Sequence, residues 1–115
     1  MKTAQDPRHQ HRINMMQQLF SYSFRPQDTK AIAAIITHLP AIDTLITTCA
    51  PEWPIDKIAK IDLAILRLSI YEITETKETP MKVVIDEAIE LAKSFGNPNS
   101  PKFINGVLGT IIQKV

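Results

Sequence analysis

The chain has 115 residues, of which 44% are apolar and 22% are charged, and its formal net charge is +1. This size and balance predict one globular domain and exclude a strongly basic protein that binds nucleic acid through its overall charge. Cys49 is the single cysteine, which excludes a disulfide framework and a cysteine metal cluster. No apolar run resembles a signal peptide or a membrane span, so we expect a cytoplasmic protein with no membrane partner.

Helical periodicity runs along the whole chain, and no segment alternates as a strand does. Helix starts are marked by a capping residue followed by proline, at Asp6-Pro7, Thr79-Pro80 and Ser100-Pro101. Pro40 is expected to break or kink a helix, and Gly96 to end one in the left-handed conformation. The predicted helices cover residues 7–24, 29–39, 41–50, 55–76 (with a break allowed near Asp62), 80–95 and 100–114. The fold class is therefore all-α, with one compact domain of about six helices over residues 1–115.

The segment "IDLAILRLSIYEI" (residues 61–73) has apolar side chains on two flanks. Such a helix packs against neighbours on both sides, which predicts the central element of the domain. Asp62 falls on a narrow polar line outside these flanks, and we expect it to be exposed. Arg67 and Glu72 are interpreted as structural charges that find partners near the core.

Other polar groups suggest chemistry but have a simpler interpretation. The carboxylates Asp86, Glu87 and Glu90 follow one another on the helix of residues 80–95, without a histidine on their face. A solvated helix face is favoured there over an acid–base or metal cluster. Cys49 and His38 have no orienting acid nearby. We therefore expect no enzyme activity, no cofactor and no metal.

The first turns of the N-terminal helix carry Arg8, His9, His11 and Arg12. Cations at a helix N-terminus oppose the helix dipole, which is slightly unfavourable. One interpretation is a solvated basic turn. The other is a phosphate site, because two arginines one turn apart can hold successive phosphates.

The last helix, "SPKFINGVLG" (residues 100–109), begins with an unusual set of side chains. Phe103 lies on the margin of the apolar stripe, with Lys102 and Asn105 beside it. Core packing is one explanation for Phe103, and stacking against an unpaired base is the other. Gly106 and Gly109 lie opposite the stripe, which suggests that something approaches that side closely.

Three segments in this order resemble the NusB family of bacterial transcription antitermination factors. They are "LAILRLSIYEI", "PMKVVIDEAIELAKSFG" and "SPKFINGVLG", and the resemblance is dense from Trp53 to Ile111. It implies an all-α fold of two packed helical subbundles. Relatives usually have some twenty more residues between the first helix and the tryptophan, so the N-terminal half is expected to be shortened.

The resemblance also implies partners: boxA-type single-stranded RNA of nascent rRNA transcripts, the ribosomal protein NusE, and the RNA polymerase antitermination complex. By matching position, the RNA contacts would be Arg8, Arg12, Lys102, Phe103 and Asn105. Phe20 and Asp62 match positions that contact NusE in the family. His9 and His11 stand where relatives often carry further arginines.

Two other functions are compatible with the same residues. A NusB-like domain also occurs at the N-terminus of an RNA cytosine methyltransferase, so a recognition module for rRNA modification is one alternative. The other is a shortened relative that kept the fold and a protein partner without independent RNA binding.

Overall fold

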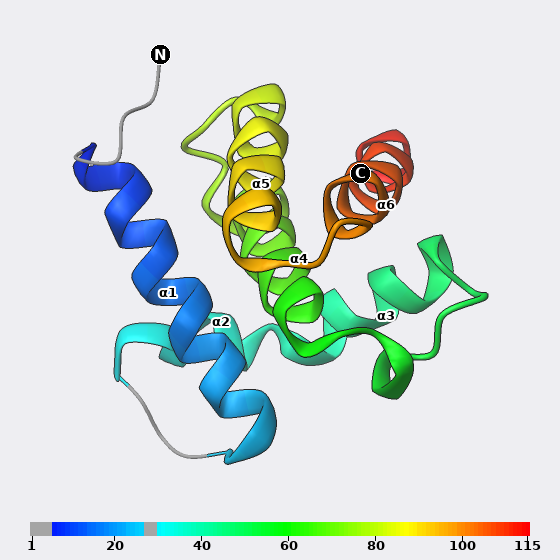
Figure 1. Ribbon diagram of the computed structural model, residues 1–115, viewed down its shortest axis with the longest axis horizontal. Helices are drawn as coiled ribbons and strands as arrows, with labels where there is room; N and C mark the ends of the chain where they lie inside the picture. The colour runs from blue at the N-terminus through cyan, green and yellow to red at the C-terminus, as the bar shows by residue number, and fades with distance from the viewer. Residues whose placement is uncertain (1–5, 27–29) are drawn as a thin grey trace.

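The structure is a computed structural model, and it describes residues 6–26 and 30–115. All of its regular elements in these residues are helical (Figure 1). The α-helices are α1 (Pro7–Phe24), α2 (Ala33–Thr37), α3 (Leu39–Cys49), α4 (Lys60–Tyr71), α5 (Met81–Phe95) and α6 (Ser100–Lys114). Two 3₁₀ turns, η1 (Lys30–Ile32) and η2 (Ile55–Lys57), and one π-helical turn, η3 (Glu72–Thr76), connect them. The predicted all-α fold with a shortened N-terminal half is confirmed, since only η1 and the short α2 separate α1 from α3.

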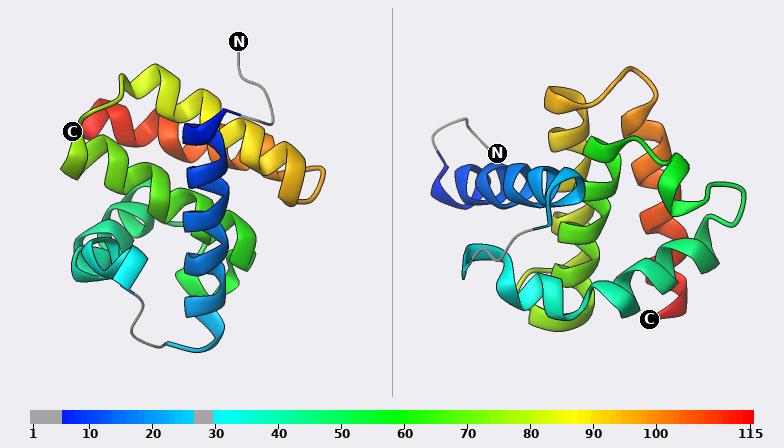
Figure 2. Two further views of the ribbon diagram at one scale, coloured as in Figure 1. Left: turned by 90° about the vertical axis from the view of Figure 1, so that its left-hand side faces the viewer. Right: turned by 90° about the horizontal axis from the view of Figure 1, so that it is seen from below.

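Helix α4 is the central element, as its two apolar flanks predict. Its residues 62–70 are all buried. Helices α1, α3, α5 and α6 pack around it, and α1 lies across α4 and α5 on the side opposite α3 and α6 (Figures 1 and 2). Because α4 contacts all four of these helices, it holds them in position relative to one another.

The helix starts follow the predicted signals with local shifts. Asp6 caps α1, where its Oδ1 accepts a hydrogen bond from the Arg8 backbone N–H at 2.9 Å. Ser100 is the first residue of α6 rather than its cap, and α5 begins at Met81, one residue after Pro80. Helix ends fray, so shifts of one residue are common there.

Pro40 has a different role from the one expected. It lies in the first turn of α3, where its missing N–H would have no helical partner, so it starts this helix instead of breaking one. The break falls at His38. The predicted start of this helical region at residue 29 lies outside the described residues. The break in the predicted helix 55–76 falls at residues 58–59, between η2 and α4.

Gly96 was expected to adopt the left-handed conformation, and this prediction is wrong. Its φ is −90° and its ψ is −171°, an extended geometry open to other residues. A Cβ at Gly96 would collide with the Ser100 side chain and would lie 2.8 Å from the Ala92 carbonyl oxygen. The glycine is required by this close approach of α6 to the end of α5.

Among the described residues, no single helix is long and apolar enough to cross a membrane. The bent pair formed by residues 30–37 and 39–49 passes the same test of length and composition only when the two segments are taken together.

The three glycines give opposite predictions for stability. Nothing lies within 4 Å of a Cβ built at Gly106 or Gly109, both inside α6. Alanine at either position should therefore raise the free energy of unfolding by about 0.5–1 kcal/mol through helix propensity. Gly96→Ala should lower it by about 1–3 kcal/mol because the added methyl overpacks the contact with Ser100. Urea unfolding of the three variants measures these changes, and destabilisation by Gly106→Ala would contradict the open space beside α6.

Candidate functional site

The basic turn at the start of α1 divides into an exposed and a buried part. The Arg8 side chain is 84% exposed, and its guanidinium lies 3.5 Å from the Asp6 carboxylate. His11 is also exposed. The hydrogen bond from the Arg8 backbone N–H lowers the pKa of Asp6. Arg8 is thus a cation that is open to solvent and to a phosphate.

Arg12 is held by carboxylates inside the domain. Its Nε donates to Glu72 Oε2 at 2.9 Å, and its Nη2 donates to Glu72 Oε1 at 2.7 Å. The Arg12 side chain is 11% exposed, and Nη2 also reaches Thr79 Oγ1 at 3.4 Å. The hydrogen bonds with Glu72 raise the pKa of Arg12 above its ordinary value. A phosphate at Arg12 would have to compete with this two-bonded ion pair, which joins α1 to the π-helical turn η3.

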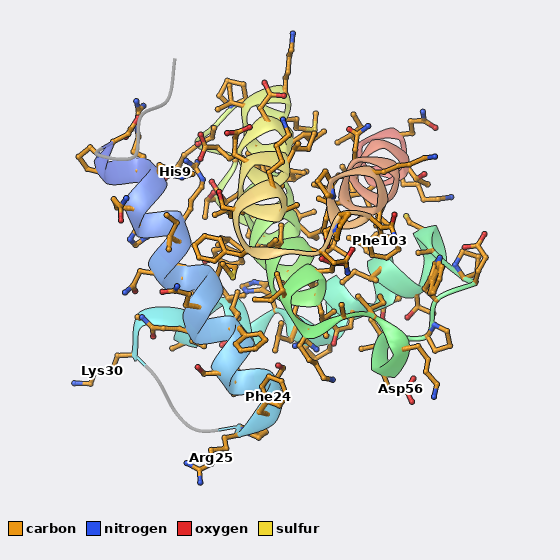
Figure 3. The ribbon with its side chains drawn as sticks, in the orientation of Figure 1. His9, Phe24, Arg25, Lys30, Asp56 and Phe103 are labelled. Carbon is orange, nitrogen blue, oxygen red and sulfur yellow. The ribbon has the colours of Figure 1, made fainter. Side chains whose placement is uncertain are left out.

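Glu87 corrects the expectation of a solvated carboxylate face on α5. It is only 4% exposed, and its Oε1 lies 2.9 Å from His9 Nδ1 and 3.8 Å from Arg12 Nη1. His9 accordingly points from α1 toward α5 (Figure 3). The sequence held a signal for this burial, because Glu87 shares its helix face with Val84 and Leu91.

Arg67 confirms the interpretation of charged residues on α4 as structural. Its Nε and Nη2 donate to the two carboxylate oxygens of Asp43 at 3.0 and 2.8 Å. This fork ties α4 to α3. Like the Arg12–Glu72 pair, this ion pair is held by two hydrogen bonds.

A cavity of about 460 Å³ opens where η2, the start of α4 and the start of α6 meet. Its aromatic wall is formed by Trp53 and Phe103, whose rings meet edge to face with centroids 5.9 Å apart. Two lysines, Lys57 and Lys102, line it as well. Lys102, Trp53 and Lys57 are exposed, and Phe103 is half-buried against the core. The cavity therefore combines ring faces with positive charge, which suits an unpaired base and its phosphates.

Asp62 lies in this cavity and contradicts the expectation of an exposed carboxylate. It is 6% exposed, and its buried Oδ1 has no hydrogen-bond partner. Burial raises the pKa of Asp62, and a hydrogen bond with the Ser100 side chain opposes that rise. Asp62 therefore lies beside the N-terminal end of α6 and is largely removed from solvent.

The other predicted site residues lie apart from the cavity. Asn105 is exposed on α6 but does not line the cavity. Phe20 is half-buried on α1 and packs edge to face with Phe24 at 4.9 Å. Phe24 is 60% exposed, and Figure 3 shows it at the end of α1, well away from Phe103.

The contributions of Trp53 and Lys57 to the cavity were not predicted from the sequence. Both lie in or beside the short turn η2, where neither helical period nor a motif predicts a direction for the side chain. Across residues 6–26 and 30–115, no three His, Cys, Asp or Glu side chains are grouped closely enough to hold a metal ion.

The fold and the cavity define a small all-helical domain with an aromatic and basic recess beside its central helix. The chain matches the family model described as "NusB family" over residues 9–113. It belongs to the NusB family.

Similar proteins agree with this assignment. The transcription antitermination protein NusB of Chloroflexus aggregans is 46% identical over 79 residues, which cover 67% of this chain and 53% of that protein. The protein of the same name from Herpetosiphon aurantiacus is 38% identical over 100 residues, or 84% and 68% of the two chains. The chain thus spans about half to two thirds of the length of these relatives.

Solved structures show the same fold. A structure of T. maritima NusB superposes with a TM-score of 0.84 at 34% identity and covers 99% of this chain and 94% of that chain. A chain in a crystal structure of the antitermination factors NusB and NusE in complex with dsRNA gives a TM-score of 0.82 at 19% identity, covering 94% and 97%. At this identity the second likeness concerns the fold alone.

Alanine substitutions of Arg12 and Arg8 should affect the stability of the domain very differently. Arg12→Ala leaves the half-buried Glu72 without its cation and should lower the free energy of unfolding by about 3 kcal/mol. Arg8→Ala, its matched control one turn earlier on α1, should unfold close to the parent because Arg8 is solvated. Chemical denaturation compares the two. Equal stability of both variants would show that the Arg12–Glu72 fork is not needed by the fold.

Asp62 should make stability fall as the pH rises. Its folded-state pKa is raised above the ordinary value of 3.8, so the folded state holds the proton more tightly than the unfolded chain. The free energy of unfolding therefore falls as the pH rises from 3.8 through the raised pKa, and the loss remains at neutral pH. Asp62→Asn should raise the free energy of unfolding at pH 7, because the neutral amide removes the cost of burying the charged carboxylate. This gain should shrink as the pH falls toward 3.8, whereas a gain independent of pH would contradict the explanation.

Proposed function

We propose that this chain is a transcription antitermination factor that binds boxA-type RNA of nascent rRNA transcripts together with ribosomal protein NusE. Membership of the NusB family supports the class of function. Relatives carry the name transcription antitermination protein NusB, and a related fold occurs in a complex with NusE and dsRNA. The proposal includes assembly with RNA polymerase into an antitermination complex.

The observation that carries the RNA part is the cavity beside α6. It places the Phe103 and Trp53 rings next to Lys57 and Lys102. A base in a duplex is already stacked on its neighbours, so an open aromatic wall favours a single-stranded segment. Asn105 offers an amide on the same helix for a hydrogen bond outside the cavity.

The start of α1 forms the second part of the proposed RNA surface. Arg8 is the more accessible of its two arginines, and we expect it to contact a phosphate directly. Arg12 donates two hydrogen bonds to Glu72, so we expect it to contribute less to RNA binding than Arg8. Its contribution should be indirect, because this ion pair holds α1 in position. His11 adds an exposed imidazole next to them.

The partner surface proposed for NusE is the end of α1. Phe20 and Phe24 form an aromatic pair whose outer ring is mostly exposed. An exposed aromatic pair is typical of an interface anchor. Asp62, the other residue that resemblance assigns to NusE, lines the cavity with Phe103 instead. Separate titrations with NusE and with RNA distinguish these roles for Asp62.

The proposed RNA site should respond to two substitutions in different ways. Phe103→Ala should weaken binding of boxA-like single-stranded RNA by about 1–3 kcal/mol through lost stacking. Lys102→Ala should weaken the binding of all RNA sequences alike. It should also flatten the slope of log K against log salt by about 0.7, the value for one phosphate of a single strand. Fluorescence titrations with boxA-like, scrambled and duplex RNA, with and without NusE, measure both effects.

Lys114→Ala is the matched control, because Lys114 is an exposed lysine at the far end of α6. It should leave affinity and slope unchanged. If parent and Phe103→Ala bind RNA equally while both remain folded, the cavity is not the RNA site. If the parent binds NusE but no RNA, the chain is a protein-interaction module and the RNA part of the proposal is wrong.

A further inference from the structure

The cavity is lined by Asp62, and one oxygen of its carboxylate has no hydrogen-bond partner. Asp62 Oδ1 is buried and has no hydrogen-bond partner in the described structure. Buried acceptors are almost always paired, because an unpaired one loses its water without compensation. The Ser100 side chain hydrogen-bonds with the Asp62 carboxylate, and this bond leaves Oδ1 unpaired. A ligand that brings a donor to Asp62 would supply the missing partner.

The charges around Asp62 restrict the kind of ligand. The other charged side chains that line the cavity are Lys57 and Lys102, so the lining carries one negative and two positive charges. A cationic side chain or a metal ion would meet net positive charge here. A ligand with a neutral donor group and an anionic backbone fits the same arrangement, because the donor meets Asp62 and the phosphates meet the lysines. These charges favour RNA over a basic protein segment.

The aromatic wall restricts the ligand further. Phe103 and Trp53 present ring surfaces beside Asp62, and Trp53 is 50% exposed. A flat ring that stacks on this wall has its edge available for a hydrogen bond with the carboxylate. Adenine, cytosine and guanine carry an exocyclic amino group at such an edge. Uracil carries a single carbonyl oxygen where cytosine carries this amino group, and a carboxylate repels that oxygen.

We propose that Asp62 is a base-selecting residue, which accepts a hydrogen bond from the exocyclic amino group of a nucleobase stacked in the Phe103 cavity. The inference rests on the proposed RNA-binding function and adds the chemistry of one position of the RNA. At that position the protein prefers an amino-bearing base over uracil. Asp62 thereby acts in sequence recognition, whereas Lys57 and Lys102 act on the backbone irrespective of sequence.

The test is a cytosine-to-uracil exchange, one position at a time, along a boxA-like single-stranded RNA. With the parent protein and NusE, at least one exchange should weaken binding about fivefold to twentyfold, the range for loss of one good base contact. In Asp62→Asn the same exchange should change affinity less than about twofold, because an amide can either donate or accept. Asp56→Asn is the matched control, since Asp56 is exposed on η2 and does not line the cavity. It should discriminate as the parent does.

The outcomes separate this inference from the proposed function. If the parent binds no RNA, the proposed function fails and the inference fails with it. If the parent binds RNA in a Phe103-dependent way but Asp62→Asn keeps the full discrimination, only the inference is overturned. If Asp62→Asn loses NusE binding in the absence of RNA and keeps its discrimination, Asp62 is a protein contact and base selection is overturned. Circular dichroism and thermal unfolding of each variant verify that it is folded.

Discussion

Helix α4 is buried over residues 62–70, so the polar side chains on that stretch need hydrogen-bond partners inside the protein. Arg67 satisfies this requirement with the two oxygens of Asp43 on α3. At the end of α4, Glu72 accepts two hydrogen bonds from Arg12 of α1. The polar groups of one central helix thereby fix the positions of its neighbours, in addition to the apolar packing that surrounds it. Asp62 is the exception, and it lies where a cavity opens.

This arrangement separates structural from accessible charge at the start of α1. Arg8 and Arg12 are one turn apart and chemically identical, yet one is solvated and the other is enclosed by Glu72 and Glu87. Both residues lie on the same face of α1, so the difference comes from what lies opposite each of them. Arg12 meets Glu72 and Glu87, whereas Arg8 pairs with Asp6 at the exposed start of the helix. A basic turn in the sequence is therefore only partly a basic surface. The net charge of +1 makes each remaining exposed cation important for any contact with phosphate.

The cavity depends on how α5 is joined to α6. Gly96 permits the Ser100 side chain to approach, and this contact brings the first turn of α6 next to the start of α4. Phe103 and Lys102, from that turn, then meet Trp53 and Lys57 from the region of η2. Residues separated by some fifty positions along the chain form one recess because both turns pack at the same end of α4. A change at this junction would alter the recess even without touching its lining.

The sequence by itself determined the all-α class, the central helix and most of the helix boundaries. These depend on local periodicity and capping, which are properties of neighbouring residues. It also singled out Lys102 and Phe103 through their unusual place at the margin of an apolar stripe, and the family resemblance drew attention to Phe20 and Asp62. The direction of a polar side chain relative to distant helices cannot be read in the same way. The sequence therefore predicted Glu87 and Asp62 to be exposed, and only the tertiary structure decided that both are buried. It also decided that Pro40 starts a helix and that Trp53 faces Phe103. For Glu87, Asp62 and Trp53 the deciding factor is a long-range contact, and the energy of such a contact depends on a partner that the local pattern does not contain.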